Sequence, residues 1–349
     1  MSNSKYRVGV SPRIRRADGS PVFPAYDLGP LAEAADIELD LLPREKILTR
    51  ETLDEFDAVI LFLEQVREQS FAGGGAVRLT HIARFGVGYD TIDVPACSAN
   101  DVVLTITPDG VRRPMGQAIM ALLLAMVGNL LPKDRIVRGG AQAWPESGDF
   151  HGRGLVGLTL GTVGCGNIGT EMFRLAKPFD MRFIAHDPYV DAAEKGELGI
   201  EMVDLESVFR RSDILTFNCW LSDETRGIGS RERLALMKPN AYLINTSRGP
   251  VVDQPALLEV LQERRIAGAA LDVFDPEPPG PDDPILALDN VVLTPHALGH
   301  TDQMHALFGE INCTAIQTVL SGQVPANVVN LDVLEGAGLQ AKLARLGAA

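Results

Sequence analysis

The sequence has few of the features that would place the protein outside the cell, in a membrane or around a metal ion. Its four cysteines, Cys97, Cys165, Cys219 and Cys313, form no C-x-x-C pair and no cysteine–histidine group at zinc spacing. The longest apolar run, residues 118–127, is too short to cross a bilayer, and no basic, apolar leader opens the chain. We therefore expect a reduced, cytoplasmic protein with no metal and no membrane partner.

Positive charge is also scarce. The chain has 32 Lys and Arg against 46 Asp and Glu, a net charge of −14. This balance argues against nucleic acid or an anionic membrane as the main partner, and an anionic substrate would need a local basic cluster. With 349 residues, 46% of them hydrophobic, the chain can bury a sizeable core and is long enough for about two domains.

Apolar strands alternate with helices along the chain, which predicts an α/β fold with parallel sheets covered on both faces. A helix with Pro114 in its first turn should lead into the second unit, and a helix within residues 300–320 should return to the first. Residues 133–150 should be an exposed loop or arm, and residues 333–346 a frayed tail. The expected strands are residues 6–11, 37–42, 58–63, 81–85 and 102–106 in a first unit, and 159–163, 182–186, 214–218, 241–245, 268–272 and 291–293 in a second.

The stretch 159–187, TLGTVGCGNIGTEMFRLAKPFDMRFIAHD, has the order strand, glycine turn, helix, strand and acid. This is the dinucleotide-binding fingerprint. Gly164 permits the tight turn, Gly166 leaves room for the pyrophosphate, and Gly169 lets the helix lie close to the sheet. The alternative, a tight turn without a ligand, is disfavoured because every part of the fingerprint is present.

The cofactor should be NAD. Asn167 and Ile168 begin the helix, where free N–H groups and the positive end of the helix dipole favour phosphates. Asp187 should accept hydrogen bonds from the adenosine ribose, and its carboxylate would repel a 2′-phosphate.

Three chemically active side chains follow successive strands of the second unit. Arg248 lies in the turn after residues 241–245, Glu277 in a Pro-rich loop after 268–272, and His296 after 291–293. Ligands of open parallel sheets bind beyond the carboxyl ends of the strands. A guanidinium can pair with a carboxylate, an imidazole can exchange a proton, and a carboxylate can support the imidazole. Taken singly, each could instead be a surface ion pair, a structural histidine or a solvated loop charge.

Several motifs in order, FGVGYDTIDV, the glycine fingerprint, NTSRGPVVD, ALDVFDPEP and LTPH, resemble those of the D-isomer-specific 2-hydroxyacid dehydrogenases. The resemblance implies an NAD-dependent enzyme that interconverts a small D-2-hydroxy acid and its 2-oxo acid. Arg248 would bind substrate, Glu277 would support the histidine, and His296 would be the acid/base. The backbone near Val87 and Gly88 would hold the substrate carboxylate. Further cofactor contacts would come from Cys219, Thr246 and Asp272.

The resemblance also implies a domain arrangement. A Rossmann cofactor domain, residues 111–299, would be inserted in a flavodoxin-like substrate-binding domain, residues 1–110 and 300–349, both doubly wound around parallel sheets. A homodimer formed through the cofactor domains is expected.

The chain departs from the family pattern at a few positions. Gln254 replaces the usual acid after VVD, where we expect little catalytic weight, and Trp220 stands where proline is common. Arg112 and Arg113 precede the linking helix and, with Arg84, could bind a second anionic group of the substrate. Alternatively, Arg112 and Arg113 pair with carboxylates of the linker or of a dimer mate.

Two other functions are compatible with the same residues. One is an NAD(H)-sensing interaction protein on this fold, and the other is a formate or phosphite dehydrogenase of the same fold. Turnover with a panel of 2-oxo acids would separate them from the main prediction.

Overall fold

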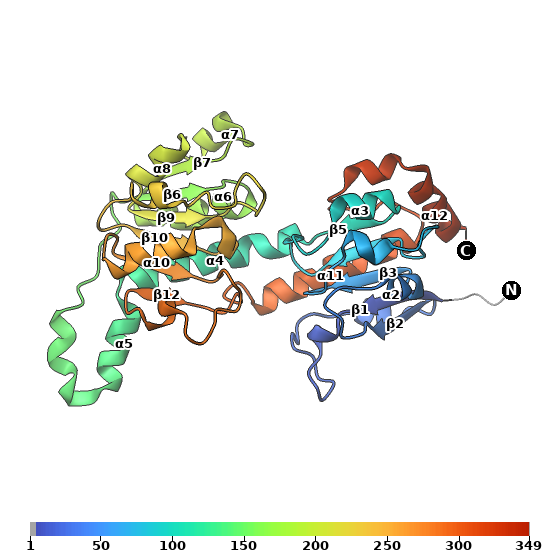
Figure 1. Cartoon of the computed structure of the whole chain (residues 1–349), viewed down its shortest axis with the longest axis horizontal. Coiled ribbons are helices and arrows are strands. Elements are labelled where there is room, and N and C mark those ends of the chain that lie inside the picture. The colour runs from blue at the N-terminus through green and yellow to red at the C-terminus, as the bar shows by residue number, and fades with distance from the viewer. Residues whose placement is uncertain (1–4, 349) are drawn as a thin grey trace. The chain divides into compact units, whose positions relative to one another are not determined.

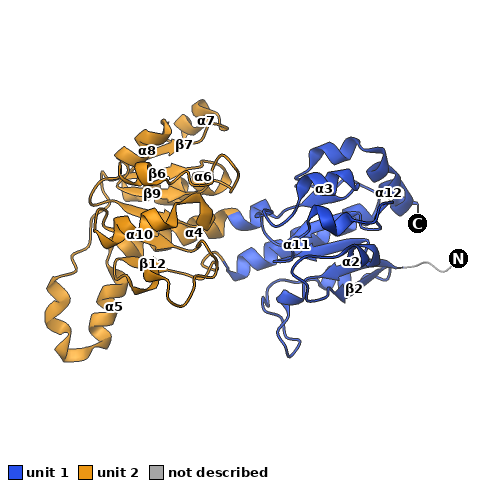
Figure 2. Cartoon of the chain, in the orientation of Figure 1, with its two compact units in different colours: residues 1–111, 300–349 blue, residues 112–299 orange. Residues whose placement is uncertain are grey.

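The computed structural model describes residues 5–348, and the chain divides into two compact units. Unit 1 extends to Val111 and resumes at His300, and unit 2 is the continuous segment Arg112–Gly299 (Figure 2). Each unit is built on one parallel sheet with helices, as Figure 1 shows, so the predicted α/β class is confirmed.

Unit 1 has a sheet of five parallel strands in the order β2-β1-β3-β4-β5, the flavodoxin-like order. Strands β3 and β4 are buried along their whole length, as expected for strands covered on both faces. The strands are β1 (Tyr6–Val10), β2 (Ile37–Leu41), β3 (Ala58–Leu61), β4 (His81–Arg84) and β5 (Val103–Thr105). The helices are α1 (Gly29–Ala32), α2 (Arg50–Glu55), α3 (Val94–Ala99), α11 (Asp302–Leu320) and α12 (Ala337–Gly347).

Unit 2 has a sheet of seven parallel strands in the order β12-β11-β10-β9-β6-β7-β8. Numbered within the unit, this is the doubly wound order 3-2-1-4-5-6 with a seventh strand added. The strands are β6 (Thr159–Val163), β7 (Arg182–His186), β8 (Ile200–Met202), β9 (Ile214–Phe217), β10 (Tyr242–Asn245), β11 (Gly268–Leu271) and β12 (Val291–Leu293). The helices are α5 (Leu130–Arg138), α6 (Asn167–Ala176), α7 (Ala192–Glu197), α8 (Leu205–Arg211), α9 (Arg231–Leu234) and α10 (Gln254–Gln262).

The expectation of six strands in this unit was wrong, because β8 was missed. This edge strand has only three residues, and Glu201 in its middle interrupts the apolar pattern.

Side-chain caps fix where several helices begin. Asp204 accepts from the Ser207 N–H before α8, and Thr301 accepts from the Met304 N–H before α11. Such caps replace hydrogen bonds that the first turn of a helix cannot make within itself.

The linking helix, α4 (Pro108–Val127), begins earlier than predicted. Pro114 lies inside the helix, not in its first turn, which Pro108 occupies instead. A proline in a helix interior removes one backbone hydrogen bond. Here the helix continues because it buries a long apolar stripe that includes Ile119 and Leu123.

No single helix within residues 5–348 is long and apolar enough to cross a membrane. By length and composition alone, α4 and α5 would pass together as a pair bent by 62°.

The segment 133–150 is exposed, but it is largely helical and not a plain loop. It contains the end of α5 and two short 3-10 turns, Gly140–Gln142 and Trp144–Gly148. Trp144 is 60% exposed and Val137 is 61% exposed, so this arm presents apolar side chains to solvent.

The prediction of a frayed tail was also wrong, because α12 docks on unit 1. Leu339 and Leu343 are buried against Val103 of β5 and Val319 of α11. The Lys342 ammonium donates to the carbonyl oxygens of Leu79, Asn100 and Asp101, at 2.8, 3.1 and 3.1 Å. Burial lowers the pKa of Lys342 to about 8.

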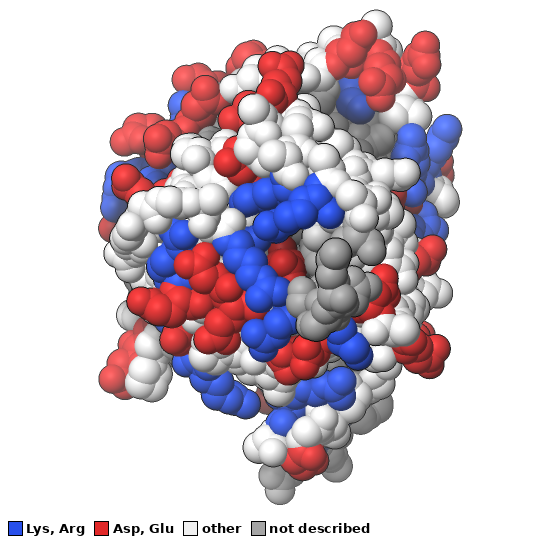
Figure 3. Space-filling model, turned by 90° about the vertical axis from the view of Figure 1, so that its right-hand side faces the viewer, with Lys and Arg blue, Asp and Glu red and all other residues white. Residues whose placement is uncertain are grey.

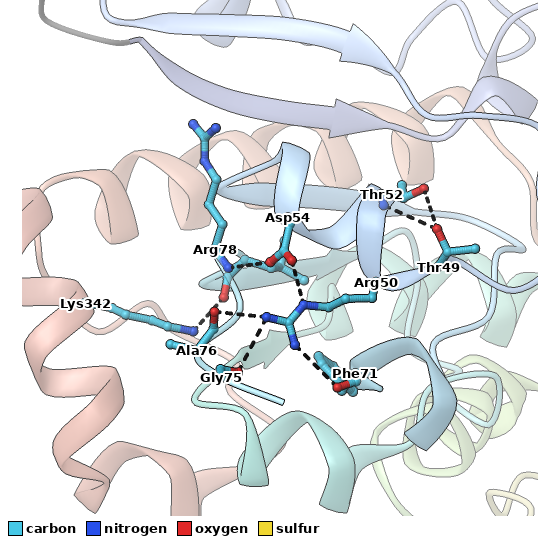
Figure 4. Close-up of polar contacts among 10 residues, drawn as sticks. Thr49, Arg50, Thr52, Asp54, Phe71, Gly75, Ala76, Arg78 and Lys342 are labelled. Atoms are coloured by element: carbon cyan, nitrogen blue, oxygen red, sulfur yellow. Dashed lines mark hydrogen bonds and ion pairs between the residues drawn. The ribbon is translucent and has the colours of Figure 1, made fainter. Parts of the chain in front are cut away.

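A second polar network lies near Lys342 in Figure 4. Arg50 pairs with Asp54 at 2.7 Å and donates to the backbone carbonyls of residues 71, 75 and 76. Asp54 in turn accepts from the Arg78 N–H. The network therefore fastens loops of unit 1 to one another.

Figure 3 shows one face of the molecule, on which basic side chains gather in the middle with acidic side chains around them.

Candidate active site

The glycine turn after β6 has the shape that a dinucleotide requires. Gly164 has φ +93°, and a Cβ there would lie 2.4 Å from the Cys219 nitrogen. A Cβ on Gly169 would lie 2.5 Å from the Gly164 oxygen, whereas a Cβ on Gly166 would meet open space. The turn and the helix are thus held close together, while space remains in front of Gly166.

The start of α6 faces this space. Gly166 precedes Asn167 and Ile168 and supplies no side-chain cap to the helix. A ten-residue helix whose first N–H groups lack such a cap suits a phosphate. The residues present therefore fit a dinucleotide.

Asp187 follows β7 and is tied to the glycine turn. Its Oδ2 accepts from the Cys165 N–H at 2.8 Å and its Oδ1 from the Tyr189 N–H at 3.0 Å. These two bonds fix the orientation of the carboxylate beside the turn.

Cys219 and Thr246 lie just beyond the ends of β9 and β10. Burial raises the pKa of the Cys219 thiol to about 12, so the thiol stays protonated at neutral pH. Thr246 is buried.

The turn that presents Arg248 is held by a neighbouring amide. The side chain of Asn245 donates to the Arg248 carbonyl at 3.0 Å and accepts from the Ser247 N–H at 3.1 Å. Arg248 itself donates to the Ser247 carbonyl at 2.7 Å. A Cβ on Gly249 would lie 1.9 Å from the Phe274 oxygen, so this turn rests directly on the backbone that leads to Glu277.

Glu277 and His296 are in contact. His296 Nδ1 lies 2.6 Å from Glu277 Oε1, and Glu277 Oε2 accepts from the Phe274 N–H at 3.2 Å. Burial alone would raise the pKa of the Glu277 carboxyl, but the His296 hydrogen bond and charge, the Phe274 N–H and the charge of Arg248 together hold it below its ordinary value. Because β10, β11 and β12 are neighbours in the sheet, the loops with Arg248, Glu277 and His296 are adjacent.

Asp272 has a structural task that the sequence did not indicate. It is buried at the end of β11, and its Oδ1 accepts from Thr294 Oγ1 at 2.6 Å. The same oxygen accepts from the N–H groups of Ala297 and Leu298 at 3.2 and 3.4 Å. Asp272 therefore holds both ends of the turn that presents His296, whose φ is +52°. The only indication in the sequence was a polar residue at or directly after the end of an apolar strand, and Asn245 at the end of the neighbouring strand β10 is a second example.

In unit 1, Val87 and Gly88 follow β4 and are half-buried. Arg84 supports this turn by donating to the carbonyls of Gly88, Leu61 and Phe85 at 2.7, 3.0 and 2.9 Å. Arg84 is only 8% exposed. Its Nε and Nη1 donate to backbone oxygens, so Arg84 supports this turn, and its contribution to an anion site stays a prediction.

Arg113 is also paired, with Glu171 of α6 at 2.6 Å. This bond, the charge of Arg113, a hydrogen bond from Arg174 and the charge of Arg112 together hold the pKa of Glu171 below its ordinary value despite burial. The partner of Arg113 is thus a carboxylate of unit 2, and not one of the linker or of a dimer mate as the alternative had it. Arg112 is exposed, and its role in substrate binding stays a prediction.

A seven-stranded doubly wound sheet with this glycine turn defines a dinucleotide-binding protein. The family model for the NAD binding domain of the D-isomer specific 2-hydroxyacid dehydrogenases matches residues 120–297. A glyoxylate reductase from Korarchaeum cryptofilum is 36% identical over 318 residues, 90% of this chain and 95% of that protein. The chain therefore belongs to the D-isomer specific 2-hydroxyacid dehydrogenase family, as its motifs predicted.

Solved structures agree with this assignment. A D-lactate dehydrogenase from Aquifex aeolicus, complexed with NAD and lactic acid, is 25% identical with a TM-score of 0.78 over 93% of this chain and 99% of that chain. An acyclic imino acid reductase in complex with NADPH and D-Arg is 26% identical with the same TM-score and the same coverage. The chain is an oxidoreductase of this family, acting on CH–OH groups with NAD(P).

Proposed function

We propose that the protein reduces a small 2-oxo acid of the glyoxylate type to its 2-hydroxy acid with NADH, and catalyses the reverse oxidation. The observation that carries this proposal is the His296–Glu277 pair, 2.6 Å apart, with Arg248 on the next strand-end loop. The name of the Korarchaeum cryptofilum relative supports glyoxylate as the first substrate to test.

His296 is the proposed acid/base. Glu277 engages its Nδ1, so Nε2 is the ring atom that exchanges a proton with the substrate oxygen. Glu277 stabilises the ring when it is protonated and fixes its orientation. The bound nicotinamide supplies or accepts the hydride.

Arg248 is the proposed substrate anchor. A guanidinium can bind the carboxylate of the acid in two parallel hydrogen bonds and polarise the neighbouring carbonyl. The N–H groups near Val87 and Gly88 in unit 1 are also proposed to bind the substrate carboxylate. Unit 1 is accordingly the proposed substrate-binding domain, and unit 2 the cofactor domain.

NAD is the proposed cofactor, in preference to NADP, because Asp187 follows β7 beside the glycine turn, where its carboxylate would repel a 2′-phosphate. Gly164, Gly166, Asn167 and Ile168 would hold its phosphates. Further contacts would come from Cys219, Thr246 and Asp272.

A homodimer through unit 2 is also proposed. The apolar side chains exposed on the arm, Trp144 and Val137 among them, support this proposal. The molar mass from light scattering would test it.

The decisive test is a substrate panel followed by NADH absorbance. Glyoxylate, pyruvate and hydroxypyruvate should be reduced, and His296→Ala should lower kcat by roughly 10²–10⁴ with NADH affinity retained. Oxidation of formate or phosphite without 2-oxo acid reduction would favour a dehydrogenase of that type. Tight NADH binding with no turnover of any acid would favour an NAD(H)-sensing protein.

A further inference from the structure

The loop that carries Glu277 is poor in backbone hydrogen-bond donors, although the Asp283 N–H donates to the Gly280 oxygen at 3.1 Å within it. It runs from residue 275 to residue 283, between β11 and the 3-10 turn Pro284–Ala287. Proline has no N–H, so each proline removes a donor that could fasten the loop. Those prolines are Pro276, Pro278, Pro279 and Pro281. Contacts from outside the loop therefore add to the little that its own backbone can supply.

The side chain of Gln254 holds both ends of this loop. Its Oε1 accepts from the Asp275 N–H at 2.9 Å, and its Nε2 donates to Asp283 Oδ2 at 3.4 Å. Gln254 is the first residue of α10, but Asp253 caps that helix by accepting from the Ala256 N–H at 3.0 Å. The Gln254 amide is thus not needed for the helix and is directed to the loop.

The tie at Asp275 acts next to the groups that orient Glu277. The Phe274 N–H, one residue before Asp275, donates to Glu277 Oε2 at 3.2 Å. Glu277 Oε1 in turn contacts His296 Nδ1 at 2.6 Å. A shift of the backbone at residues 274–275 would therefore move the Glu277 carboxylate and, through it, the imidazole.

We propose that Gln254 is a positioning residue for the Glu277–His296 pair, acting by clasping the loop 275–283 at its two ends. This proposal rests on the proposed function of that pair. It differs from the expectation that Gln254 has little catalytic weight.

The chemistry of the clasp requires an amide. One end offers an N–H donor and the other a carboxylate acceptor, and an amide has an oxygen for the first and an NH2 group for the second, whereas an ionised carboxylate only accepts. A glutamate at 254 could still accept from Asp275, but it would face the Asp283 carboxylate at 3.4 Å. Two carboxylates at that distance repel each other unless one is protonated.

The test exchanges the amide and the carboxylate between positions 254 and 283. Gln254→Glu should lower kcat by about tenfold, since small misplacements of catalytic groups have effects of this order or larger. The KM for the 2-oxo acid and the Kd for NADH should change less than twofold. The double variant Gln254→Glu/Asp283→Asn restores one donor and one acceptor, and kcat should return to within about twofold of the wild type.

Two further variants sharpen the comparison. Gln262→Glu adds the same charge at the exposed far end of α10 and should leave kcat unchanged. If Gln254→Glu fails to fold, Gln254→Met, which leaves the Asp275 N–H unpaired, should show the same fall in kcat. Circular dichroism and thermal unfolding report on folding of each variant.

The proposal is overturned if folded Gln254→Glu and Gln254→Met keep kcat within twofold of the wild type, or if the double variant recovers none of the loss. Glu277→Gln separates this failure from that of the proposed function. An impaired Glu277→Gln beside a fully active Gln254→Glu rejects the clasp alone. Full activity of Glu277→Gln and His296→Ala rejects the proposed function and the clasp with it.

Discussion

Replacing Glu277 by glutamine tests the pair that underlies the proposed chemistry. The carboxylate is bonded on both sides, by His296 Nδ1 at 2.6 Å and by the Phe274 N–H at 3.2 Å. Glutamine has a single oxygen, so when it accepts from Phe274 its NH2 group faces His296 Nδ1. The charged form of the ring then has no anionic partner, and kcat/KM for reduction should fall.

The size of the fall follows from the contact and its exposure. A hydrogen bond to a charged group contributes about 1.5–3 kcal/mol. The His296 and Glu277 side chains are 40% and 38% exposed, so solvent screens the pair and the lower part of that range applies. A loss of about 1.5–2 kcal/mol corresponds to a decrease of roughly 10- to 30-fold in kcat/KM.

The assay is the decrease of NADH absorbance with glyoxylate, alongside NADH binding by fluorescence. Glu263→Gln is a matched control, because Glu263 is exposed and pairs with Arg265 at 2.9 Å away from the site. The control should match the wild type within about twofold, well under 1 kcal/mol. A Glu277→Gln enzyme within about threefold of the wild type would refute the reasoning.

Three further outcomes are expected. NADH should give a higher kcat/KM than NADPH, and Asp187→Asn should reduce the ratio of these two kcat/KM values. Equal kcat/KM with the two cofactors in the wild type would refute the assignment of NAD. Arg248→Lys keeps the charge but loses the planar fork, so kcat/KM should fall by roughly 10–100-fold; full activity would make Arg248 structural. The pKa of Lys342 falls from 10.5 to about 8, so above about pH 8 the folded chain holds fewer protons than the unfolded chain. The free energy of unfolding of the wild type, relative to that of Lys342→Met, should therefore rise between pH 8 and pH 10.5, by up to about 3 kcal/mol. If the difference in urea midpoint between the wild type and Lys342→Met did not change with pH, this prediction would be refuted, because the three carbonyls would then keep the amine charged in the folded chain.

Long-range order was predictable where the sequence repeats a strong pattern. Strand β3 is a continuous apolar run, strands β6 and β9 are mostly apolar with threonine between, and the glycine turn marks the first strand of unit 2. The adjacency of Arg248, Glu277 and His296 followed from a rule about parallel sheets, because each residue comes directly after a strand.

The remaining features depend on contacts between residues that are far apart in the sequence. Pro114 inside α4 contradicts local preference and is tolerated because of burial, which the local sequence does not report. The sequence suggested Arg84 as a cation for the substrate, but it could not show that the guanidinium donates to backbone oxygens. The sequence indicated no role for Gln254, because its hydrogen-bond partners, Asp275 and Asp283, lie 21 and 29 residues away.

The assembly of unit 1 from both ends of the chain has a consequence for biosynthesis. Unit 2 is continuous and has its last strand once Leu293 is made. The strands of unit 1 are translated first, yet β4 and β5 must wait for α11 and α12 to cover them. A nascent chain thus passes through a stage in which a complete unit 2 is joined to an N-terminal sheet with part of its apolar surface uncovered. At that stage the chain is most exposed to aggregation and most in need of chaperones.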